Sequence, residues 1–589
     1  MESVVLGIGG LLGHDGNAAL LVDGRIVAAS QEERFTRRKH DAAFPRQAAL
    51  DCLEMASLVP SDVRWCVFAE KPLQSLIFGR TGMPTTRRSW ALSRLVSDRE
   101  FQYPVAARRL FPKARFRYAW HHLSHAAAAL STSPFDRAAF LCVDGKGEDV
   151  SATVGVADRQ ATEIRFELPF ENGVGLLYTL VTSFLGFPSF GSEYKVMGLA
   201  PYGEPKLVGE LRRFSESDSD GALRLRERAT FFADDMNQSV EALGRHLGLR
   251  PRAKGEALTE SHVNLAASVQ ELFEQEVEKM AAFARRVTGE SRLLFCGGCA
   301  QNCVAAGRLR RSGIFESVFN SPVGGDMGSG LGAALLFEQQ RQGRVEKVDA
   351  LGFCLGSSPG DPPGEALPFL VPTEGTIHEA TAKLLADGKI IGWIRGRMEL
   401  GARALGARSI LADPRVPHMQ STLNLKVKFR ESFRPFAPAV LAEDCGDWFD
   451  SVEPSDYMQY TAFLRPERRH PIPPTLNGLR ERLDFKRCDL PSIVHVDYSA
   501  RLQTVRREVH PDFHELILEF KRLTGVPILI NTSFNVSGQP IVRTAGEAWE
   551  CFRHTDMDYL VLGDRIYRNP NDLGREEKLA WLRQFEDFS

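Results

Sequence analysis

Short apolar runs near the start of the chain, separated by polar turn residues, indicate β-strands. The stretches VVLGIGG, AALLVDG and RIVAAS are largely apolar, and the turns between them are rich in Gly, Asp and Asn, as hairpins require. A similar unit returns at residues 138–157, AAFLCVDGKGEDVSATVGVA, where an apolar strand, an Asp-Gly turn and a second strand follow one another. Two such units separated by helical sequence predict a duplicated α/β domain with a cleft between its halves.

Helical periodicity dominates residues 260–286, which include the run HVNLAASVQELFEQEVEKMAAFARR. The pattern changes around residues 339–376, where periodicity is weak and Gly and Pro are frequent, as is typical of a connection between domains. A second α/β region follows, with many arginines beside Gly, Ser and Asn. We therefore predict an N-terminal domain at 1–345, a linker at 346–375 and a C-terminal domain at 376–589.

Composition narrows the classes of protein to consider. The 589 residues are 43% apolar and 25% charged, as in globular proteins, and are too many for one core. The net charge of −2 and the pI near 6.7 give no whole-chain attraction for nucleic acid or membranes, so we expect neither as a partner. No run approaches the ~18 apolar residues that span a bilayer. MESVVLGIGG lacks the features of a signal peptide, and ten cysteines in so long a chain do not resemble a disulfide framework. We expect a cytoplasmic enzyme or binding protein.

The run HHLSHAAAAL contains an HxxxH pair, His121 and His125. It is rich in alanine and should be helical, which places the two imidazoles one turn apart on one face. Asp144 follows the apolar strand AAFLCV and can project from its end into a cleft. Two histidines and a carboxylate suit Fe(II), Mn(II) or Zn(II). By spacing alone, a metal site and ordinary core or surface histidines explain the pair equally well. His122 lies on another face of the expected helix.

Two glycine-rich turns indicate sites where the protein backbone can contact a ligand. Asp326 lies among glycines at an expected helix N-terminus, where N–H groups can face an anion, although the turn could equally be a well-capped helix start. In GGCAQN, residues 297–302, a Gly-Gly pair after a strand lets the backbone approach a phosphate, and Asn302 could meet a ribose or phosphate. No Walker motif occurs, so a P-loop nucleotide site is excluded. We expect Cys296, Cys299 and Cys303 to pack as small apolar residues rather than bind a metal.

The C-terminal region carries a dense set of cations among Gly, Pro and short apolar runs. Arginine binds phosphate or carboxylate with two parallel hydrogen bonds, and these arginines flank strand-like segments rather than a lysine-rich amphipathic helix. A solvated basic face is the alternative for the set. NTSFN follows the apolar strand VPILI and offers Ser533 and Asn535 as neutral donors. The cations are Arg397, Arg403, Arg408, Lys428, Arg430, Arg434 and Arg501.

The motifs GHDGNAA, EERFTRRKH, HHLSHA, VDGKGE, SEYKVMGLAPYG, GGCAQN and GGDMGSGLGAA, in this order, resemble the N-terminal half of O-carbamoyltransferases of the nodulation-factor, cephamycin and tobramycin type. The resemblance implies a duplicated actin-like ATPase (ASKHA) domain, similar to the tRNA threonylcarbamoyl-transferase. It implies a metal, iron first with manganese or magnesium as alternatives, held by His121, His125, Asp144 and Asp326. It places ATP in the same cleft, with contacts from Gly145, Lys146, Gly297, Gly298, Asn302 and Gly325.

The C-terminal half is similar to a YrdC-like α/β domain through its K-x-R and S-x-N patterns and the runs around HVD and ILINTSFNVSG. The resemblance implies that this domain binds carbamoyl phosphate. The residues that match the family pattern are Arg397, Lys428, Arg430, His495, Arg501, Ser533 and Asn535.

Together the two halves imply ATP-dependent transfer of a carbamoyl group from carbamoyl phosphate, through carbamoyladenylate, to a hydroxyl of a small molecule. As a hypothesis, His14 deprotonates or orients the acceptor and Lys39 contacts phosphate or acceptor; the alternative for both is an ordinary loop residue. The motifs assign no role to Glu193 or Lys195, do not identify the acceptor, and leave a homodimer open. Four other classes compete: an actin-like kinase, a threonylcarbamoyl-tRNA enzyme, a hydrogenase-maturation enzyme and a binding protein.

Overall fold

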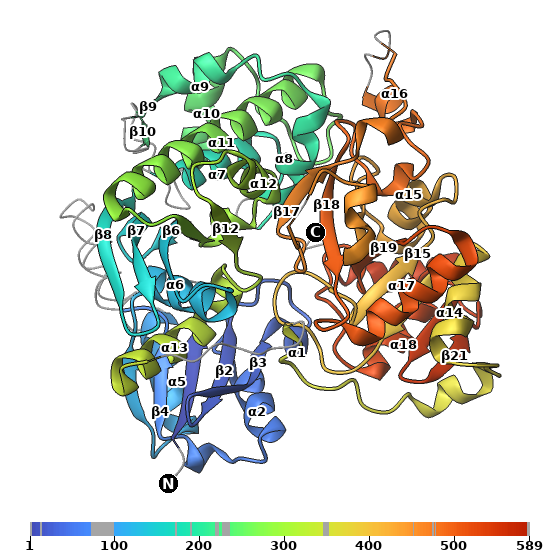
Figure 1. Ribbon diagram of the computed structural model, residues 1–589, viewed down its shortest axis with the longest axis horizontal. Helices are drawn as coiled ribbons and strands as arrows, with labels where there is room; N and C mark the ends of the chain where they lie inside the picture. The colour runs from blue at the N-terminus through green and yellow to red at the C-terminus, as the bar shows by residue number, and fades with distance from the viewer. Residues whose placement is uncertain are drawn as a thin grey trace. The chain divides into compact units, whose positions relative to one another are not determined.

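The computed structural model describes residues 3–11, 14–71, 99–170, 173–188, 191–217, 223–225, 236–344, 353–451, 453–473, 476 and 479–585. The chain divides into two compact units (Figure 1). The first unit holds Met1–Val27 and Ala42–Val348, and the second holds Ala28–Asp41 and Asp349–Ser589. The chain therefore passes from one unit to the other three times.

The first unit contains two five-stranded sheets with the same strand order. One has the order β3-β2-β1-β4-β5 and the other has the order β8-β7-β6-β11-β12. In each, the central strand pairs antiparallel with a hairpin partner on one side and parallel with a later strand on the other. The predicted opening meander of three strands is confirmed. The elements are β1 (Val4–Gly9), β2 (Asn17–Val22), β3 (Arg25–Gln31), which runs on into the second unit, α2 (Arg46–Met55), η1 (Pro60–Asp62), β4 (Trp65–Phe68), α5 (Arg99–Leu110), β5 (Arg115–Tyr118), α6 (His121–Thr132), β6 (Arg137–Gly147), β7 (Val150–Asp158), β8 (Thr162–Pro169), α7 (Val174–Phe184), α8 (Glu193–Leu199), η4 (Ala200–Tyr202), α9 (Val208–Phe214), β9 (Ser215–Ser217), β10 (Leu223–Leu225), α10 (Met236–Leu247), α11 (Glu260–Thr288), β11 (Arg292–Cys296), η5 (Gly298–Gln301), α12 (Cys303–Arg311), β12 (Ser317–Asn320), η6 (Asp326–Gly328) and α13 (Ser329–Gln342).

The second hairpin differs from its prediction. The Asp-Gly pair expected to form its turn lies inside β6, where the pairing with β7 shifts register between Val143 and Gly147. The strands resume after this bulge, and the turn falls at Glu148, whose φ is 46°. The sequence signal for a turn therefore marked a bulge, which also needs residues that tolerate irregular backbone.

The helices α6 and α13 pack against each other and connect the two sheets of the first unit (Figure 1). Helix α6 packs on β6, β7 and β11, whereas α13 packs on β1, β2 and β4. A Cβ atom at Gly332 of α13 would lie 1.9 Å from the Ser124 carbonyl oxygen of α6, and one at Gly7 of β1 would lie 1.9 Å from the Gly330 carbonyl oxygen. Glycines of the GSGLGAA run thus permit close packing of the two helices and β1.

The second unit is built on a nine-stranded mixed sheet of order β13-β21-β20-β14-β15-β19-β16-β18-β17. Apolar side chains of its strands alternate between two cores: Ile410 packs on one face and Leu411 on the other. The elements are α1 (Glu33–Thr36), η8 (Gly364–Phe369), β13 (Leu370–Val371), α14 (Ile377–Ala386), β14 (Ile391–Ile394), β15 (Arg408–Ala412), α15 (Met419–Thr422), η9 (Leu423–Lys428), β16 (Ala437–Leu441), η10 (Ala442–Asp447), β17 (Tyr460–Phe463), η11 (Pro466–Arg468), α16 (Leu479–Asp484), η12 (Pro491–Ile493), β18 (Ser499–Val505), α17 (Pro511–Thr524), β19 (Ile528–Ser533), α18 (Ala545–Arg553), β20 (Tyr559–Leu562), β21 (Arg565–Arg568) and α19 (Arg575–Arg583).

The segment 28–41, called the strap below, comes from the N-terminal part of the sequence but belongs to the second unit. The Arg34 guanidinium donates to the Gly401 carbonyl at 2.8 Å, and the Gly401 N–H donates to Gln31 Oε1 at 3.2 Å. Arg37 donates to the carbonyls of Ile541 (2.9 Å) and Pro540 (2.8 Å). The predicted N-terminal domain, residues 1–345, includes this strap, whereas the structure groups the strap with the second unit.

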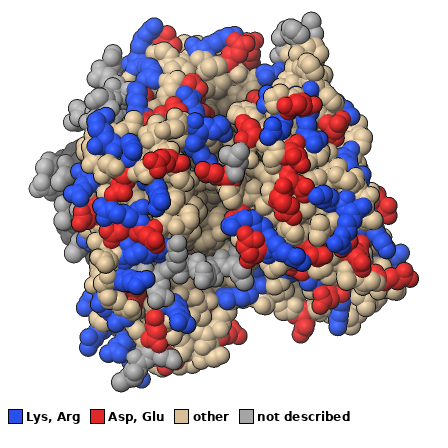
Figure 2. All heavy atoms as spheres, viewed as in Figure 1, with Lys and Arg blue, Asp and Glu red and all other residues tan. Residues whose placement is uncertain are grey.

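The predicted linker, 346–375, is outside the described residues up to position 352. From Phe353 onward its residues contribute to the second unit, since β13 pairs with β21 and the Ala545 N–H donates to the Pro359 carbonyl at 2.8 Å. None of the helices that the structure describes is long and apolar enough to cross a membrane. Figure 2 shows basic and acidic side chains intermixed on the face in view, and the net charge of the chain is only −2.

Candidate functional site

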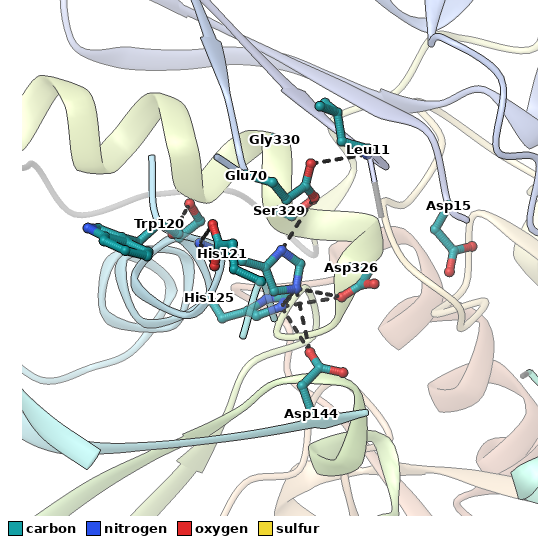
Figure 3. Close-up of polar contacts among 12 residues, drawn as sticks. Leu11, Asp15, Glu70, Trp120, His121, His125, Asp144, Asp326, Ser329 and Gly330 are labelled. Carbon is teal, nitrogen blue, oxygen red and sulfur yellow. Dashed lines mark hydrogen bonds and ion pairs between the residues drawn. The ribbon is translucent and has the colours of Figure 1, made fainter. Parts of the chain in front are cut away.

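Two histidines and two aspartates of the first unit point at one another (Figure 3). His121 Nε2 and His125 Nε2 are 3.0 Å apart, and both lie 3.3 Å from Asp326 Oδ1. Asp144 Oδ2 lies 3.2 Å from His125 Nε2 and 3.7 Å from His121 Nε2. One potential ligand atom from each residue lies within 4.8 Å of the others, and all four residues are nearly inaccessible to solvent. We call this group the HHDD cluster.

The elements that carry the HHDD cluster explain its convergence. His121 and His125 are one turn apart on α6, as the HxxxH spacing predicts. Asp144 leaves the β6–β7 ladder at the bulge, so its side chain is free to turn toward the helix. Asp326 begins η6, immediately before α13, and α13 packs on α6. The packing of α6 against α13 therefore joins the two ends of the site.

Charges within the HHDD cluster strongly perturb its proton affinities. Burial and the His121 charge lower the pKa of His125, but hydrogen bonds to Asp144 and Asp326 outweigh them and raise this pKa to about 9. The pKa of His121 is likewise raised by the same carboxylates against the effect of burial. Burial raises the pKa values of both aspartates, and the histidines lower them well below the usual range. A metal-free cluster therefore holds protons where a cation would otherwise sit.

The residues present fit a metal ion. Two Nε2 atoms that face each other at 3.0 Å, with carboxylate oxygens around them, offer neutral nitrogen and anionic oxygen donors to a single point. Asp326 Oδ1 is buried and lies 3.3 Å from both Nε2 atoms. A mixed N/O donor set suits first-row transition ions. The geometry therefore offers what the predicted metal would need.

Residues outside the predicted set support the HHDD cluster. Glu70 Oε1 lies 3.3 Å from His121 Nδ1, and Glu70 Oε2 accepts from the Leu11 N–H at 3.1 Å. This carboxylate can hold the His121 ring with Nε2 directed at the cluster. Glu148 accepts from the backbone N–H groups of His121 (3.2 Å) and Lys71 (3.1 Å). Glu70 follows the apolar strand WCVF, the same strand-end signal that identified Asp144.

The predicted catalytic His14 lies beside the cluster, with Nε2 3.2 Å from Asp326 Oδ2 and Nδ1 3.0 Å from Asp15 Oδ2. Its side chain is 43% exposed, in contrast to the buried cluster. Burial lowers the pKa of His14, whereas the Asp326 and Asp15 carboxylates raise it, to about 10 overall. Asn17 connects the two sides of this region, because it donates to the Asp15 and Asp326 carbonyls and accepts from the Gly330 N–H.

The predicted ATP-binding residues lie at strand ends of the second sheet. Gly145 and Lys146 belong to the β6 bulge, Gly297 and Gly298 follow β11, and Gly325 precedes Asp326. Gly297 has a φ of 90°, and a Cβ there would lie 2.3 Å from the Val143 carbonyl oxygen, so glycine is required. The Gly298 N–H donates to Asp144 Oδ2 at 3.1 Å, which links this turn to the HHDD cluster.

The Asn302 side chain already makes hydrogen bonds within the protein. Its side chain caps α12 by accepting from the Ala305 N–H at 3.1 Å, and it exchanges hydrogen bonds with Gln270. A nucleotide contact would have to replace one of these bonds. Glu193 accepts from Thr179 Oγ1 and from the Gly191 N–H, both at 2.8 Å, which fixes the start of α8, and Lys195 is buried. None of the possible metal-ligand groups among the described residues contains a cysteine.

In the second unit, the K-x-R and S-x-N motifs meet at Lys428. Its ammonium donates to the carbonyls of Ser533 and Asn535, both at 2.7 Å, to Asn535 Oδ1 at 2.5 Å and to Ser533 Oγ at 3.3 Å. Burial lowers the pKa of Lys428 well below its usual range, and the nearby charges of Arg430, Arg434 and Lys39 lower it further. Lys428 therefore supports the Ser533–Asn535 turn at the centre of a cationic group.

This cationic group includes Lys39 of the strap. The sequence predicts that Lys39 contacts phosphate or acceptor, and this role stays a prediction. The structure groups Lys39 with the second unit, where Arg37 fixes the neighbouring backbone on Pro540 and Ile541.

Each of the remaining predicted anion-binding residues has its own contacts within the second unit. Arg430 donates to Asn424 Oδ1 at 2.7 Å and lies over the Phe436 ring, 4.5 Å from its centroid. Arg397 donates to the carbonyls of Gly356 (2.9 Å) and Leu355 (2.6 Å). His495 Nδ1 accepts from the Val496 N–H at 2.7 Å, which leaves the proton of a neutral ring on Nε2, and Arg501 lies in β18.

Arg408, one of the cations noted in the sequence, is fully buried and donates to backbone carbonyls, including those of Arg543 (3.2 Å) and Ser357 (3.2 Å). It stabilises the loops around β15, a structural role that the sequence did not separate from anion binding. The seven predicted carbamoyl phosphate contacts all stay predictions, and several of these side chains, with Lys428 foremost, already make hydrogen bonds within the protein.

Comparison with known proteins covers both units. A family model described as "Carbamoyltransferase N-terminus" matches residues 4–335, and one described as "Carbamoyltransferase C-terminus" matches residues 382–569. An uncharacterized protein of Synechocystis sp., sll1178, is 40% identical over 97% of this chain and 98% of its own length. Nodulation protein NolNO of Sinorhizobium fredii is 35% identical over 95% of this chain and 80% of its own. The 3'-hydroxymethylcephem-O-carbamoyltransferase of Streptomyces clavuligerus is 27% identical over 94% of this chain and 98% of its own.

Proposed function

Because the chain belongs to the carbamoyltransferase family, we propose that it moves the carbamoyl group of carbamoyl phosphate, with consumption of ATP, to a hydroxyl of a small molecule. The observation that carries this proposal is the HHDD cluster in the part matched by the N-terminal family model. The family match extends over the second unit, which holds the cationic group around Lys428.

The proposed reaction has three steps. Water releases phosphate from carbamoyl phosphate and leaves carbamate. A carbamate oxygen then attacks the α-phosphorus of ATP, so that pyrophosphate departs and carbamoyladenylate forms. Finally the acceptor hydroxyl attacks the carbonyl carbon, AMP leaves, and the hydroxyl proton is lost. The products are a carbamate ester, AMP, pyrophosphate and phosphate. Carbamate decomposes in water, so the first two steps should be shielded from solvent.

In the second unit, the proposed role of the cationic group is to bind the carbamoyl phosphate anion. Arg430 lies near Lys428, and its guanidinium can hold a phosphate with two parallel hydrogen bonds. Lys428 would hold Ser533 and Asn535 in place, so that their side chains and backbone are pre-positioned for the ligand. Arg397, His495 and Arg501 would complete the site, and Lys39 would add a charge from the strap.

In the first unit, His121, His125, Asp144 and Asp326 would hold a metal ion, iron in the first place and manganese or magnesium as alternatives. When bound, such an ion supplies positive charge that neutralises phosphate oxygens as a leaving group departs. The strand-end glycines, Gly145, Gly297, Gly298 and Gly325, would let the phosphate chain approach the backbone. His14 would deprotonate or orient the acceptor, since it lies beside the cluster with Nε2 3.2 Å from Asp326 Oδ2 and its side chain is partly exposed.

We propose that the first unit has a duplicated actin-like ATPase fold and the second a YrdC-like fold. The repeated strand order of the two five-stranded sheets supports the duplication. The buried α6–α13 pair between the two halves supports a site formed where the halves meet. The acceptor class is proposed as a small natural product with a free hydroxyl, since the Streptomyces clavuligerus relative is named for a hydroxymethyl group.

The test is the fate of ATP in the purified full-length enzyme. We expect release of AMP and pyrophosphate that depends on carbamoyl phosphate. Ion-exchange chromatography of the nucleotides measures the AMP, and an enzymatic assay measures the pyrophosphate. Release of ADP would instead indicate a kinase. No turnover with any hydroxyl acceptor or with water would indicate a binding protein.

A further inference from the structure

A pocket of about 410 Å³ lies in the first unit beside β4, β5 and the end of α13. Its walls come from the start of β4, from residues 117–120 and from the last two turns of α13. None of the HHDD residues lines it among the described residues. A volume of this size accommodates a small organic molecule.

Aromatic rings form much of the pocket wall. Trp65 and Phe337 lie with ring centroids 5.0 Å apart and a tilt of 48°, and Tyr118 and Trp120 contribute further rings. Tyr118 is 40% exposed. Such walls present flat apolar faces to a flat partner, and stacked or tilted rings gain attraction beyond the burial of area.

The charged groups at this pocket are cations. Lys71 Nζ lies 3.6 Å from the centroid of the Trp120 ring, and the Arg117 guanidinium lies 4.8 Å from that of Trp65. No Asp or Glu is among the described lining residues; the nearby Glu148 carboxylate accepts from the backbone N–H of Lys71 and acts on the ammonium only through its charge. The third cation, Arg341, is already paired with Glu338 at 2.8 Å. The pocket therefore has positive charge that aromatic faces hold in place without neutralising it.

We propose that this pocket binds a planar aromatic anion, with the ring against the aromatic walls and a carboxylate or phosphate on Lys71 and Arg117. A neutral aromatic would leave both cations without a partner. A small aliphatic anion would leave the aromatic faces exposed to water. Aromatic carboxylates and nucleotides both carry the required combination of ring and charge. This site is additional to the proposed carbamoyl transfer and does not depend on it.

The pocket has a direct connection to the HHDD cluster through the chain. Trp120 precedes His121, and Figure 3 shows its side chain pointing away from the cluster. Lys71 follows Glu70, and Glu148 accepts hydrogen bonds from the backbone N–H groups of both Lys71 and His121. A ligand on Lys71 would therefore contact the segment that carries the supports of His121, on the opposite side from the cluster.

The experiment is isothermal titration calorimetry on the full-length protein with two probes, 1-naphthoate and AMP. We expect at least one of them to bind with a dissociation constant below about 1 mM. Arg117→Gln and Lys71→Met should each weaken that binding by about fivefold or more, since each removes one charged contact. Trp65→Leu should weaken it by removing an aromatic wall. The matched control is Arg292→Gln, which removes an arginine stacked on Phe135, outside the pocket.

The outcomes separate the sources of the anion. Sensitivity of naphthoate alone to Arg117→Gln assigns the pocket to aromatic acids, and sensitivity of AMP alone assigns it to nucleotides. Sensitivity of both shows that ring and charge suffice. AMP bound only at the proposed ATP site would be unaffected by Arg117→Gln. The proposal is overturned if neither probe binds, if the pocket variants bind as wild type does, or if 1-naphthalenemethanol binds as tightly as 1-naphthoate.

Failure of this proposal is distinguishable from failure of the proposed function. His121→Ala lies outside the pocket and should leave the affinity of the sensitive probe unchanged. Conversely, Arg117→Gln should leave carbamoyl phosphate-dependent release of pyrophosphate intact. The two results are read from separate measurements, heat of binding and nucleotide products.

Discussion

Glu70 is a residue whose effect can be measured without turnover. Replacing it by Gln removes the negative charge beside His121 Nδ1 but keeps an oxygen that can accept a hydrogen bond. We expect the affinity for the metal to fall by about 10–100-fold, the usual loss when a partner of a ligating histidine is changed. Competition with a chromogenic chelator measures it. Glu54→Gln, an exposed change on α2, is the control and should have no effect.

Arg430 tests the anion site in the second unit. Its guanidinium lies near Lys428 and is supported by Asn424 and the Phe436 ring, so Arg430→Ala removes charge at a defined position. We expect the KM for carbamoyl phosphate to rise by about tenfold or more while the KM for ATP stays the same. Steady-state kinetics with each substrate varied separately checks this. An unchanged carbamoyl phosphate requirement would remove Arg430 from the site.

Single residues were predictable where their spacing or neighbours carried the signal. His121 and His125 were linked by helical spacing, and Asp144 by its position after an apolar strand. Glu70 carries the same strand-end signal but lacks a motif of its own, so it went unnoticed. The engagement of Lys428 by four oxygens could not be foreseen, because those oxygens come from residues about a hundred positions later in the chain.

The close contact of α6 with α13 makes a prediction at the level of elements. Gly332→Ala would place a methyl group 1.9 Å from the Ser124 carbonyl oxygen, so the helices must move apart. We expect a loss of about 1–3 kcal/mol in the free energy of unfolding, as overpacking costs in cores. Metal affinity should fall too, since the same contact aligns Asp326 with His121 and His125. Chemical denaturation and metal titration are the measurements.

The control for that change is Gly209→Ala in α9, where an added Cβ meets no atom within 4 Å. Alanine is a better helix former than glycine, so this variant should be as stable as wild type or slightly more stable. Equal destabilisation of the two variants would show that helix propensity, and not the α6–α13 contact, decides the result.

Asp512 connects α14, α17 and the end of β14. It accepts from Arg395 at 2.6 and 2.7 Å and lies 2.8 Å from His378 Nε2. Burial raises its pKa, but these partners lower it more, to about 2, compared with 3.8 for a free side chain. The folded state thus gains stability above pH 3.8 that is lost as the pH falls toward 2. The side chain is 37% exposed, which limits the gain.

We therefore expect Asp512→Asn to lower Tm at pH 5 and to make Tm less dependent on pH between 4 and 2. Melting curves followed by circular dichroism over this range give both values. Asp361→Asn, an exposed change in the same unit, should leave the dependence of Tm on pH between 4 and 2 as in wild type. An acid limb of the Asp512→Asn variant equal to that of wild type would exclude this carboxylate as a contributor.

Elements were predictable where periodicity persisted. The strands of the opening meander and the helix over residues 260–286 were correct because apolar positions repeat over many residues. The Asp-Gly turn was wrong because a hairpin turn and a bulge select similar residues, and only pairing across the sheet distinguishes them. The sequence carried no signal for the packing role of Gly330 and Gly332, which permit the approach of other backbone segments, because those segments are distant in the chain.

The division of labour between the two units makes a prediction for the whole molecule. His121→Ala alters the first unit, whereas Arg430→Ala alters the second. We expect His121→Ala to lose bound metal and to transfer at least about a hundredfold more slowly, because it removes a direct ligand. Its release of pyrophosphate should fall as well, because the proposed ATP site shares the cleft with the metal. Arg430→Ala should reduce both reactions at limiting carbamoyl phosphate.

Metal content by mass spectrometry, pyrophosphate release and carbamate ester formation measure the three effects separately. Full transfer activity in a metal-free His121→Ala enzyme would remove the HHDD cluster from the chemistry. Undiminished pyrophosphate release in the same variant would show that adenylation does not depend on the metal.

The strap has a consequence for how this protein is synthesised. Residues 28–41 leave the ribosome early, yet their partners, from Leu355 to Glu547, are translated much later. At 5–20 residues per second, the strap waits on the order of tens of seconds before its docking surface exists. A fragment that starts after the linker would lack Arg34, Arg37 and Lys39. Such a fragment should regain stability when a synthetic peptide of residues 28–41 is supplied in trans.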